Sequence, residues 1–125
     1  MAVVIVIPEI PPSLNEWARW HNQKANKEKQ RWGELVWACA RQQLGIGGIR
    51  KCGFARAEVT LKYFFPSNAR RDPDNYSGKF IMDGLVSAGI LVDDSFEHVE
   101  LKLIKGGVDK KAPRVEVEIT ELEVS

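Results

Sequence analysis

Cysteine and long apolar runs are both scarce in this chain. Cys39 and Cys52 are the only cysteines among 125 residues, and their spacing matches no zinc or redox motif. Without a secretion signal a disulfide framework is not expected, so both are predicted to be plain thiols. The apolar run over residues 2–7 is too short to span a membrane and lacks the basic segment of a signal peptide. The sequence therefore predicts a cytoplasmic protein without a membrane partner.

A large excess of charge is absent as well, because the formal net charge is only +1. The charges are unevenly distributed. Nine basic residues stand against two acids in residues 18–56, whereas nine acids stand against five bases in residues 93–125. A basic half and an acidic half favour a protein that presents one face to an anion. The alternative is that the basic stretch is only a solvated helix and loop surface.

Repeats and low-complexity tracts are missing too, and a length of 125 residues suits one domain with one core. Residues 1–125 are therefore treated as a single domain. Periodic apolar patterns predict four strands and two helices. The expected strands are residues 3–7, read as buried on both faces, 57–65, 98–104 and 114–121, and the expected helices are residues 26–44 and 73–88.

The order of these elements is β-α-β-α-β-β, which predicts an α+β fold with a mixed sheet and the helices packed on one face. Alternating apolar and polar residues in the second strand indicate that it is half-buried. Gly106-Gly107 is expected to form the turn of a hairpin between the last two strands. The connection over residues 8–26 is longer than most loops, and such loops are usually functional or mobile.

The most informative stretch is Arg70-Arg71-Asp72-Pro73-Asp74-Asn75, followed later by Asp93-Asp94. Mg²⁺ needs hard oxygen ligands and is usually held by one or two carboxylates together with water and phosphate oxygens. Asp72 and Asp74, stiffened by the proline between them, form a candidate metal site with Asp94. A metal there would activate a water molecule and neutralise a phosphate under attack. Arg70 and Arg71 are placed to clamp that phosphate.

These residues also have an ordinary structural interpretation. Asp72 before a proline is a common helix N-cap, and Asp74 in a first turn favours the helix dipole. Lys79 and Asp83 are four residues apart, so they can pair on a helix surface, or Lys79 can stabilise a transition-state charge. Capping does not explain Asp94. The combination of acids therefore favours the catalytic interpretation.

Distance limits how such a site is built. A helix over residues 73–88 would be about 24 Å long, which separates Asp72 from Asp94. Two solutions remain open. Either the helix begins later or ends earlier than the pattern predicts, since Gly78 weakens its first turns, or part of the site comes from a second subunit.

Together these motifs resemble the RusA family of Holliday junction resolvases. The resemblance runs almost end to end and is carried by Pro11-Pro12-Ser13-Leu14-Asn15, Pro66, Arg70-Arg71-Asp72-Pro73-Asp74-Asn75, Lys79, Asp83-Gly84-Leu85, Ala88-Gly89, Asp93-Asp94 and Val117-Glu118-Ile119-Thr120-Glu121. It implies a homodimeric, Mg²⁺-dependent endonuclease, with Mn²⁺ as a substitute, that cuts four-way DNA junctions by paired symmetric nicks in recombination and repair. Such enzymes belong to bacteria and their phages or prophages.

The resemblance also implies roles for single residues. By position, Asp72, Asp74 and Asp94 match the family's essential carboxylates, with Asp93 assisting, and Lys79 matches its catalytic-site lysine. Asp74 and Lys79 are separated by one more residue than in the family pattern, which rotates Lys79 around a helix unless a bulge absorbs the difference. Contacts to DNA phosphates are expected from the basic residues Arg70, Arg71, Arg19, Lys24, Lys27, Lys29 and Arg31.

The sequence therefore predicts a Holliday junction resolvase in which a metal-activated water attacks a phosphodiester of branched DNA. Three alternatives remain open. A non-catalytic module would keep the fold and the acids only to bind junctions, and a related nuclease would cut flaps or other branched DNA. A small structural phage protein whose acids are helix caps would gain no stability from added metal.

Overall fold

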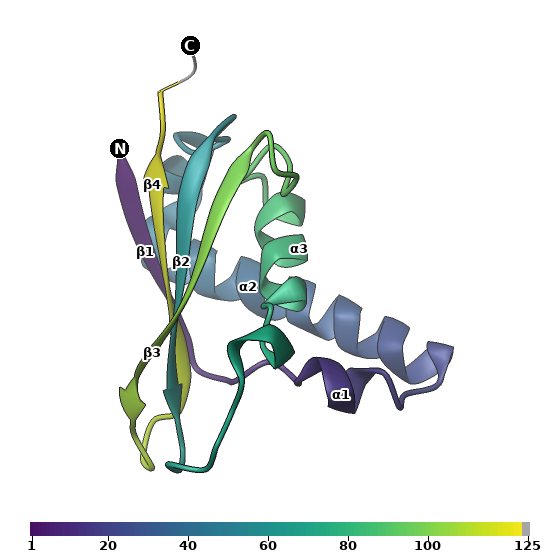
Figure 1. Cartoon of the computed structure of the whole chain (residues 1–125). Coiled ribbons are helices and arrows are strands. Elements are labelled where there is room, and N and C mark those ends of the chain that lie inside the picture. Colours follow the sequence, from purple (N-terminus) through teal and green to yellow (C-terminus); the bar gives the residue numbers. More distant parts are fainter. Residues whose placement is uncertain (124–125) are drawn as a thin grey trace.

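The computed structural model describes residues 1–123 and has a four-stranded sheet with its helices on one side (Figure 1). The strands are β1 (Ala2–Ile7), β2 (Ala57–Phe65), β3 (Val99–Val108) and β4 (Arg114–Glu121), the helices are α1 (Leu14–Trp17), α2 (Asn22–Arg50) and α3 (Lys79–Ser87), and the 3-10 turn η1 is Pro73–Asn75. The strand order is β1-β4-β2-β3, in which only β2 and β3 are parallel. The predicted α+β class and mixed sheet are confirmed.

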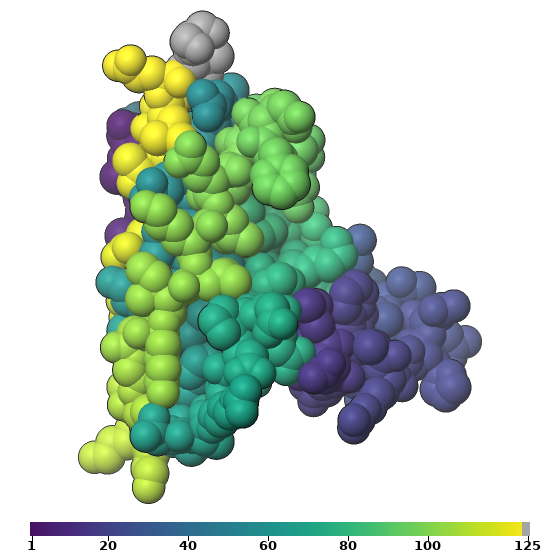
Figure 2. All heavy atoms as spheres, in the orientation of Figure 1, coloured from purple at the N-terminus to yellow at the C-terminus, as the bar shows by residue number. Residues whose placement is uncertain are grey.

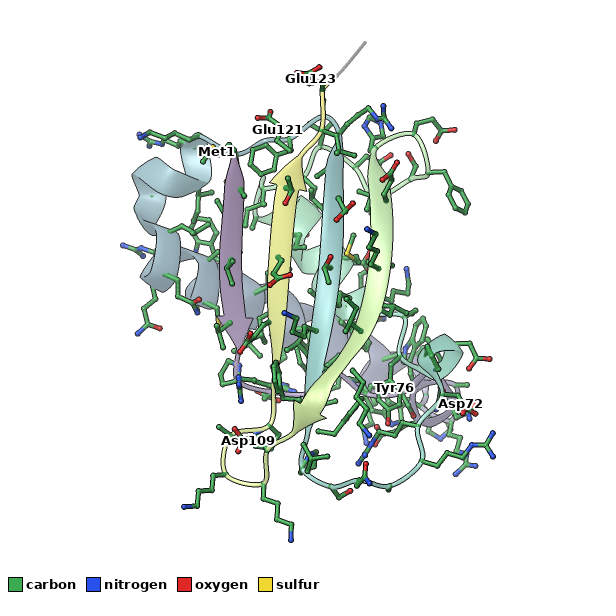
Figure 3. The ribbon with its side chains drawn as sticks, turned by 60° about the vertical axis from the view of Figure 1, so that its left-hand side comes forward. Met1, Asp72, Tyr76, Asp109, Glu121 and Glu123 are labelled. Carbon is green, nitrogen blue, oxygen red and sulfur yellow. The ribbon has the colours of Figure 1, made fainter. Side chains whose placement is uncertain are left out.

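The residues of β2 show why one face of the sheet is covered. Its odd-numbered residues are buried under the helices, whereas Glu58 and Lys62 are only partly buried. They belong to the other face of the sheet, the face without helices, which lies toward the viewer in Figure 3. There Lys62 Nζ lies 3.3 Å from Glu118 Oε1, and Glu58 pairs with Lys102 at 3.2 Å. Alternation of apolar and polar residues thus separates a core face from a solvated face. The prediction of a half-buried strand here is confirmed.

The expectation that β1 is buried on both faces is wrong. β1 is an edge strand, in which Ile5 and Ile7 are buried while Val4 is 51% exposed. Because every residue of this run is apolar, no alternation reveals the open face. Its outer edge is closed at Val6, whose N–H donates to Gln43 Oε1 and whose C=O accepts from Gln43 Nε2, both at 2.7 Å.

The predicted hairpin of the last two strands is also wrong. β2 lies between β3 and β4, and Gly106-Gly107 belongs to β3. A Cβ on Gly106 would lie 2.6 Å from Phe64 Cζ, so this glycine allows close packing beside a bulge in the β2–β3 register. The chain turns later, where the Asp109 carboxylate accepts the backbone N–H groups of Lys111 and Ala112.

α2 is longer than predicted and breaks where a break was expected. It begins at Asn22, and α1 precedes it, so residues 8–26 are not an irregular connection throughout. Gly45, which directly follows the predicted end of this helix at residue 44, has φ 72° and divides α2 at that point. No helix within residues 1–123 is long and apolar enough to cross a membrane. Along α2 an apolar stripe of Trp32, Val36, Cys39 and Ala40 is buried. The prediction of free thiols is confirmed, because Cys39 and Cys52 are both unpaired.

The second predicted helix begins later than residue 73. η1 forms first, and α3 begins only at Lys79. Between them Gly78 has φ 70°, a conformation that favours glycine, and a Cβ at this position would clash with Leu61 of β2. A later start is one of the two solutions that the distance between Asp72 and Asp94 leaves open.

α3 packs so closely on α2 that Gly84 has no room for a side chain. A Cβ at this position would lie 2.8 Å from Val36 Cβ. We predict that Gly84→Ala lowers the free energy of unfolding by about 1–3 kcal/mol through overpacking. A double-mutant cycle with Val36→Ala, measured by urea denaturation, should give a coupling energy of about 0.5–3 kcal/mol in favour of the double variant.

Gly33→Ala is the matched control, because Gly33 lies in α2 with no neighbouring atom within 4 Å of an added Cβ. This substitution should stabilise the protein by about 0.5–1 kcal/mol, since alanine has the higher helix propensity. Equal losses of stability at positions 84 and 33 would contradict close packing as the cause.

Candidate functional site

The predicted catalytic residues all lie in the connection between β2 and β3, residues 66–98. Two parallel strands cannot be joined by a tight turn and need such a crossover. Here the crossover runs through η1 and α3 and returns by a loop over residues 92–98, on the side of the sheet that the helices cover (Figure 1). The geometry of the site therefore depends on how this segment is held.

The two arginines that open the motif have different surroundings. Arg71 donates to the backbone carbonyls of Ser67 and Ala69 at 2.9 and 3.2 Å, and its guanidinium lies 4.4 Å from the centre of the Phe65 ring. It holds the shape of the loop that leaves β2. Arg70 is 88% exposed, and its Nε lies 3.2 Å from Asp72 Oδ1. Of the pair, Arg70 is the better candidate for a phosphate contact.

Asp72 and Asp74 lie on η1 with both carboxylates open to solvent. Asp72 occupies the N-cap position with extended backbone angles, as the capping interpretation predicts. Its side chain makes no capping hydrogen bond and pairs instead with Arg70. An ion pair this exposed contributes little. Helix capping therefore explains the position of Asp72 but does not explain why its carboxylate pairs with Arg70.

The turn that carries these aspartates is anchored from two sides. Asn75 Oδ1 accepts the backbone N–H of Asn15 at 2.9 Å, which joins the first turn of α1 to η1. The Tyr63 hydroxyl donates to the carbonyl of Tyr76 at 2.9 Å. The ring of Tyr76 packs edge-on against the rings of Tyr63 and Phe65. These contacts fix the point at which the chain passes from η1 to α3.

Lys79 and Asp94 line one open groove of about 730 Å³ between α3 and the outer edge of β3. Its other walls come from Ser77, Ser95 and Phe96, and from the first residues of β3. The groove combines two ammonium groups (Lys79 and Lys102), two carboxylates (Asp94 and Glu100) and two hydroxyl groups with an apolar wall. It brings together two of the predicted catalytic residues from opposite ends of α3.

Asp83 links this groove to the basic helix α2. Its Oδ2 lies 3.6 Å from Lys79 Nζ and 3.9 Å from Lys29 Nζ. The same oxygen is buried and has no hydrogen-bond partner within residues 1–123. The predicted pairing of Lys79 with Asp83 along the helix is therefore present, and it does not prevent Lys79 from lining the groove. Asp83 holds two lysines from different helices next to each other.

The adjacent Asp93 and Asp94 have separate surroundings. Asp93 Oδ1 accepts the backbone N–H of Asp94 at 2.9 Å, and Asp93 Oδ2 lies 4.0 Å from His98 Nε2. His98 Nδ1 lies 2.8 Å from the carbonyl oxygen of Ala55. Asp93 thus shapes the loop before β3. Asp94 is the member of the pair that lines the groove.

The three predicted metal ligands are not gathered within one chain. Asp72 borders a separate, smaller pocket together with Tyr76 and residues 103–105 of β3, while Asp94 borders the groove beside residues 99–102. Across residues 1–123, no group of three or more His, Cys, Asp or Glu side chains is close enough to hold a metal ion. Asp72 and Asp94 thus border two different depressions along the same strand, and Asp74 lines neither of these two.

The basic residues predicted to bind DNA differ in how free their charges are. Arg31 donates to both carboxylate oxygens of Glu9 at 3.0 Å, and this partner contributes most to raising the pKa of Arg31. Lys29 lies beside Asp83. α1 and the start of α2 project from the sheet (Figures 1 and 2), and on this projection lie the exposed side chains of Arg19, Lys24 and Lys27.

Two supporting contacts were not predicted from the sequence. The bond from Tyr63 to the Tyr76 carbonyl joins a strand to a turn, and the bond from Asn15 to Asn75 joins residues 60 positions apart. The aromatic residues of β2 give a partial signal, because a buried tyrosine usually needs a partner for its hydroxyl group. Nothing in the local pattern identifies that partner as the carbonyl of residue 76.

We predict that Tyr63→Phe lowers the free energy of unfolding by about 1 kcal/mol at neutral pH, because the Tyr76 carbonyl loses its donor. Burial raises the pKa of the Tyr63 hydroxyl in the folded protein, whereas an unfolded tyrosine ionises near pH ~10. Above that pH the wild type loses up to about 1.4 kcal/mol of stability per pH unit from this residue. The variant lacks this loss.

Urea denaturation of both proteins from neutral pH into the alkaline range measures this effect. The difference in free energy of unfolding between wild type and Tyr63→Phe should shrink as the pH rises through the ionisation of the unfolded tyrosine. A difference that stays constant over this range would show that Tyr63 has the same pKa in the folded and unfolded states.

Comparison with known proteins assigns no family to this arrangement. No family model matches the chain, and no curated protein matches it. The function is therefore inferred from the residues and from where the structure places them.

Proposed function

We propose that this protein is a Mg²⁺-dependent, structure-selective endodeoxyribonuclease of the RusA type, which resolves four-way DNA junctions by paired nicks. The observation that carries this function is the shared groove of Lys79 and Asp94 between α3 and the edge of β3. A cation and a carboxylate beside one open space are the groups needed to bind a phosphodiester and a metal ion next to each other.

The chemistry of the donor set fits a hard cation. Asp72, Asp74 and Asp94 offer only oxygen ligands, and all three side chains are exposed. Mg²⁺ is commonly held by one or two carboxylates and completes its shell with water and substrate oxygens. When bound, the metal would supply an activated water and neutralise charge on the phosphate. Within residues 1–123 Arg70 is the only ion-pair partner of Asp72, and it is itself exposed and readily displaced.

The basic groups around the site suit a polyanion. Lys79 and Lys29 approach the same Asp83 oxygen from two helices, so a single carboxylate is left facing two ammonium groups. A phosphate near this pair would meet a net positive charge. The exposed Arg19, Lys24 and Lys27 extend the positive surface along the projecting end of α2. Arg31 and Arg71, which are held by other groups, are not expected to contribute.

A non-catalytic junction-binding module is the second candidate. It is favoured because Asp72 and Asp94 border different depressions and because no group of three carboxylates lies together within residues 1–123. Such a module would use the same basic surface and would bind four-way junctions without cutting them. A nuclease specific for flaps would share the chemistry and differ in substrate.

We predict that the protein nicks a mobile four-way junction in Mg²⁺ and not in EDTA. Asp74→Asn and Asp94→Asn should each lower the cleavage rate by more than about 100-fold, since even residues that support metal ligands are worth about 10–100-fold. Glu97→Gln is the matched control, because Glu97 is an exposed acid of the Asp94 loop and should leave the rate unchanged. Gel-resolved cleavage against linear duplex and flap substrates measures all of these rates.

Each of the other outcomes would support a different function for this protein. Folded wild-type protein that binds junctions but does not cut them in Mg²⁺ or Mn²⁺ is the binding module. Cleavage of flaps alone keeps the chemistry and changes the substrate. Absence of both binding and thermal stabilisation by Mg²⁺ would leave the aspartates as structural acids, because only a site in the folded state gains stability from added metal.

A further inference from the structure

An open cleft outside the candidate metal site lies on the projection formed by α1 and the start of α2 (Figures 1 and 2). Its volume is about 230 Å³, whereas pockets for drug-sized molecules have about 300–1,000 Å³. Its lining includes two tryptophans, two apolar residues and two charged side chains, namely Trp20, Trp32, Ile10, Pro12, Lys24 and Glu28. The small volume and the aromatic wall suit one flat ring system with polar groups at its edge.

Trp32 brings an unsatisfied hydrogen-bond donor to this cleft. The residue is 1% exposed, and its indole Nε1 is buried without a hydrogen-bond partner in the part of the chain that the structure describes. A buried tryptophan N–H usually has a partner, because leaving it unpaired is costly. Trp32 lines the cleft, so an acceptor on a bound molecule would satisfy this donor. A water molecule would do the same, and the rest of the lining decides which ligand fits.

The ring of Trp20 is covered by a group that a ligand can displace. Lys24 is exposed, and its Nζ lies 4.8 Å from the centre of this ring. Glu28 stands one helical turn further along α2, but it pairs with Arg31 at 3.1 Å. A cation–π contact at an exposed site is weaker than the stacking of a nucleobase on an aromatic ring. A nucleobase would therefore replace the ammonium group on Trp20.

The charges in the cleft favour a base inside it and a phosphate outside it. The lining holds two cations, Lys24 and Arg31, and two carboxylates, Glu16 and Glu28. A phosphate inside the cleft would thus meet no net positive charge. Carboxylates instead accept hydrogen bonds from the amino or imino groups at the edge of a base. The interior of the cleft suits a neutral ring with donors at its edge.

Cations for the neighbouring phosphates stand around the cleft. Arg19 and Lys27 are exposed on the same projection and do not line the cleft. Lys24 joins them once it is displaced from Trp20. A basic surface that follows the backbone beside rings that stack on bases is the usual arrangement in proteins that bind single strands. A nucleotide within a strand therefore fits better than a free base.

Only an unpaired nucleotide offers both the ring face and the ring edge that the cleft can bind. In a duplex each base is stacked on its neighbours, and its pairing edge is already used. Taking a base out of the stack costs least where it is mismatched or already single-stranded. All four bases carry donors and acceptors on the pairing edge. Contacts with Trp32 and Glu28 therefore select an unpaired base without selecting its identity.

The cleft is joined to the helix that carries Lys79. The backbone N–H of Trp20 donates to the carbonyl of Trp17 at 3.0 Å. The ring of Trp17 packs edge-on against that of Phe80 in α3, with 5.6 Å between the ring centres. Phe80 directly follows Lys79 in the sequence. A strand held in the cleft is thus positioned by elements that pack directly on α3.

We propose that the cleft lined by Trp20, Lys24, Glu28 and Trp32 binds one unpaired nucleotide of a DNA strand. The base stacks on Trp20, accepts a hydrogen bond from the indole N–H of Trp32 and donates to Glu28. Lys24 leaves the ring and binds the neighbouring phosphate. The binding of a nucleotide is inferred from the cleft alone, whereas the choice of DNA rests on the function proposed above. Branched DNA with unpaired nucleotides at the branch is then bound more tightly than a fully paired junction.

Binding of a short fluorescein-labelled oligothymidylate in EDTA tests the cleft without any cleavage. Fluorescence anisotropy should show that Trp20→Ala raises the dissociation constant by at least about tenfold, because stacking is lost, and that Trp20→Phe retains most of the affinity. Trp37→Ala is the matched control, because Trp37 is a 40% exposed tryptophan of α2 outside the cleft. Equal losses at positions 20 and 37, or no loss at position 20, would overturn the proposal. Circular dichroism confirms that each variant is folded.

An abasic oligonucleotide of the same length separates stacking from phosphate binding. The wild type should bind oligothymidylate at least about tenfold more tightly than the abasic strand, whereas Trp20→Ala should bind both strands with similar affinity. A wild type that binds both strands equally would hold DNA through its phosphates alone, and the base would have no place in the cleft.

The salt dependence of binding tests the movement of Lys24 to a phosphate. Loss of one phosphate contact to a single strand lowers the slope of log affinity against log salt concentration by about 0.7. Lys24→Gln should show this change. Lys51→Gln is the matched control, because Lys51 is exposed at the far end of α2 and should leave the slope unchanged. The same slope for wild type and Lys24→Gln would refute the phosphate contact.

Junction binding in EDTA tests the choice of substrate. The wild type should bind a four-way junction with unpaired thymidines at its branch about tenfold more tightly than a fully paired junction, and Trp20→Ala should lose this preference. A wild type that is inactive in Mg²⁺ but needs Trp20 to bind oligothymidylate overturns the nuclease function and leaves the cleft intact. A wild type that cuts junctions but binds oligothymidylate without Trp20 overturns the cleft and leaves the nuclease function intact.

Discussion

The parallel pairing of β2 with β3 is the constraint on which the candidate site depends. Parallel neighbours cannot be joined by a tight turn, so the chain must leave one end of β2 and return to the opposite end of the sheet before β3 begins. That path is the only part of the molecule that carries η1, α3 and the Asp93–Asp94 loop. The predicted acidic residues lie on this crossover, which passes both ends of the edge strand β3.

The crossover is held in place by residues that are not candidates for catalysis themselves. The Tyr63 hydroxyl fixes the carbonyl of Tyr76, Asn75 binds the first turn of α1, and Gly84 lets α3 lie against Val36. Each contact ties a different part of the crossover to a different neighbour. Positioning of side chains by a packed scaffold is what distinguishes a preorganised site from a flexible acidic loop.

Sequence patterns predicted the parts of the fold that are set by local periodicity. The alternation of apolar and polar residues within β2 and the apolar stripe of α2 both reflect burial of one face of the element, and both are present. The glycine signals were ambiguous. Gly45 breaks a helix as predicted, whereas Gly106 serves packing against Phe64 and not a turn. A glycine is required in each case, but the reason lies in atoms that are distant in sequence.

The order of the strands could not be predicted from local sequence patterns, for a similar reason. A hairpin and a crossover leave the same apolar pattern in β3 and β4, and only β2, inserted between them, distinguishes the two. Likewise, Asp72, Pro73 and Asp74 predict a helix start equally well whether one turn or four follow. Gly78, wedged against Leu61, ends that turn early. The sequence thus names candidate residues, whereas the distances between them depend on contacts that are distant in sequence.

Because of the Gln43 amide, the two edges of the sheet differ in how readily they can pair with a further strand. A sheet with two open edges can add further copies without limit, and the product is a fibre. Here one side chain on α2 mimics the next strand at Val6 and occupies its hydrogen-bonding groups. A single glutamine thereby hinders strand addition at Val6 on this edge and disfavours fibre growth from it.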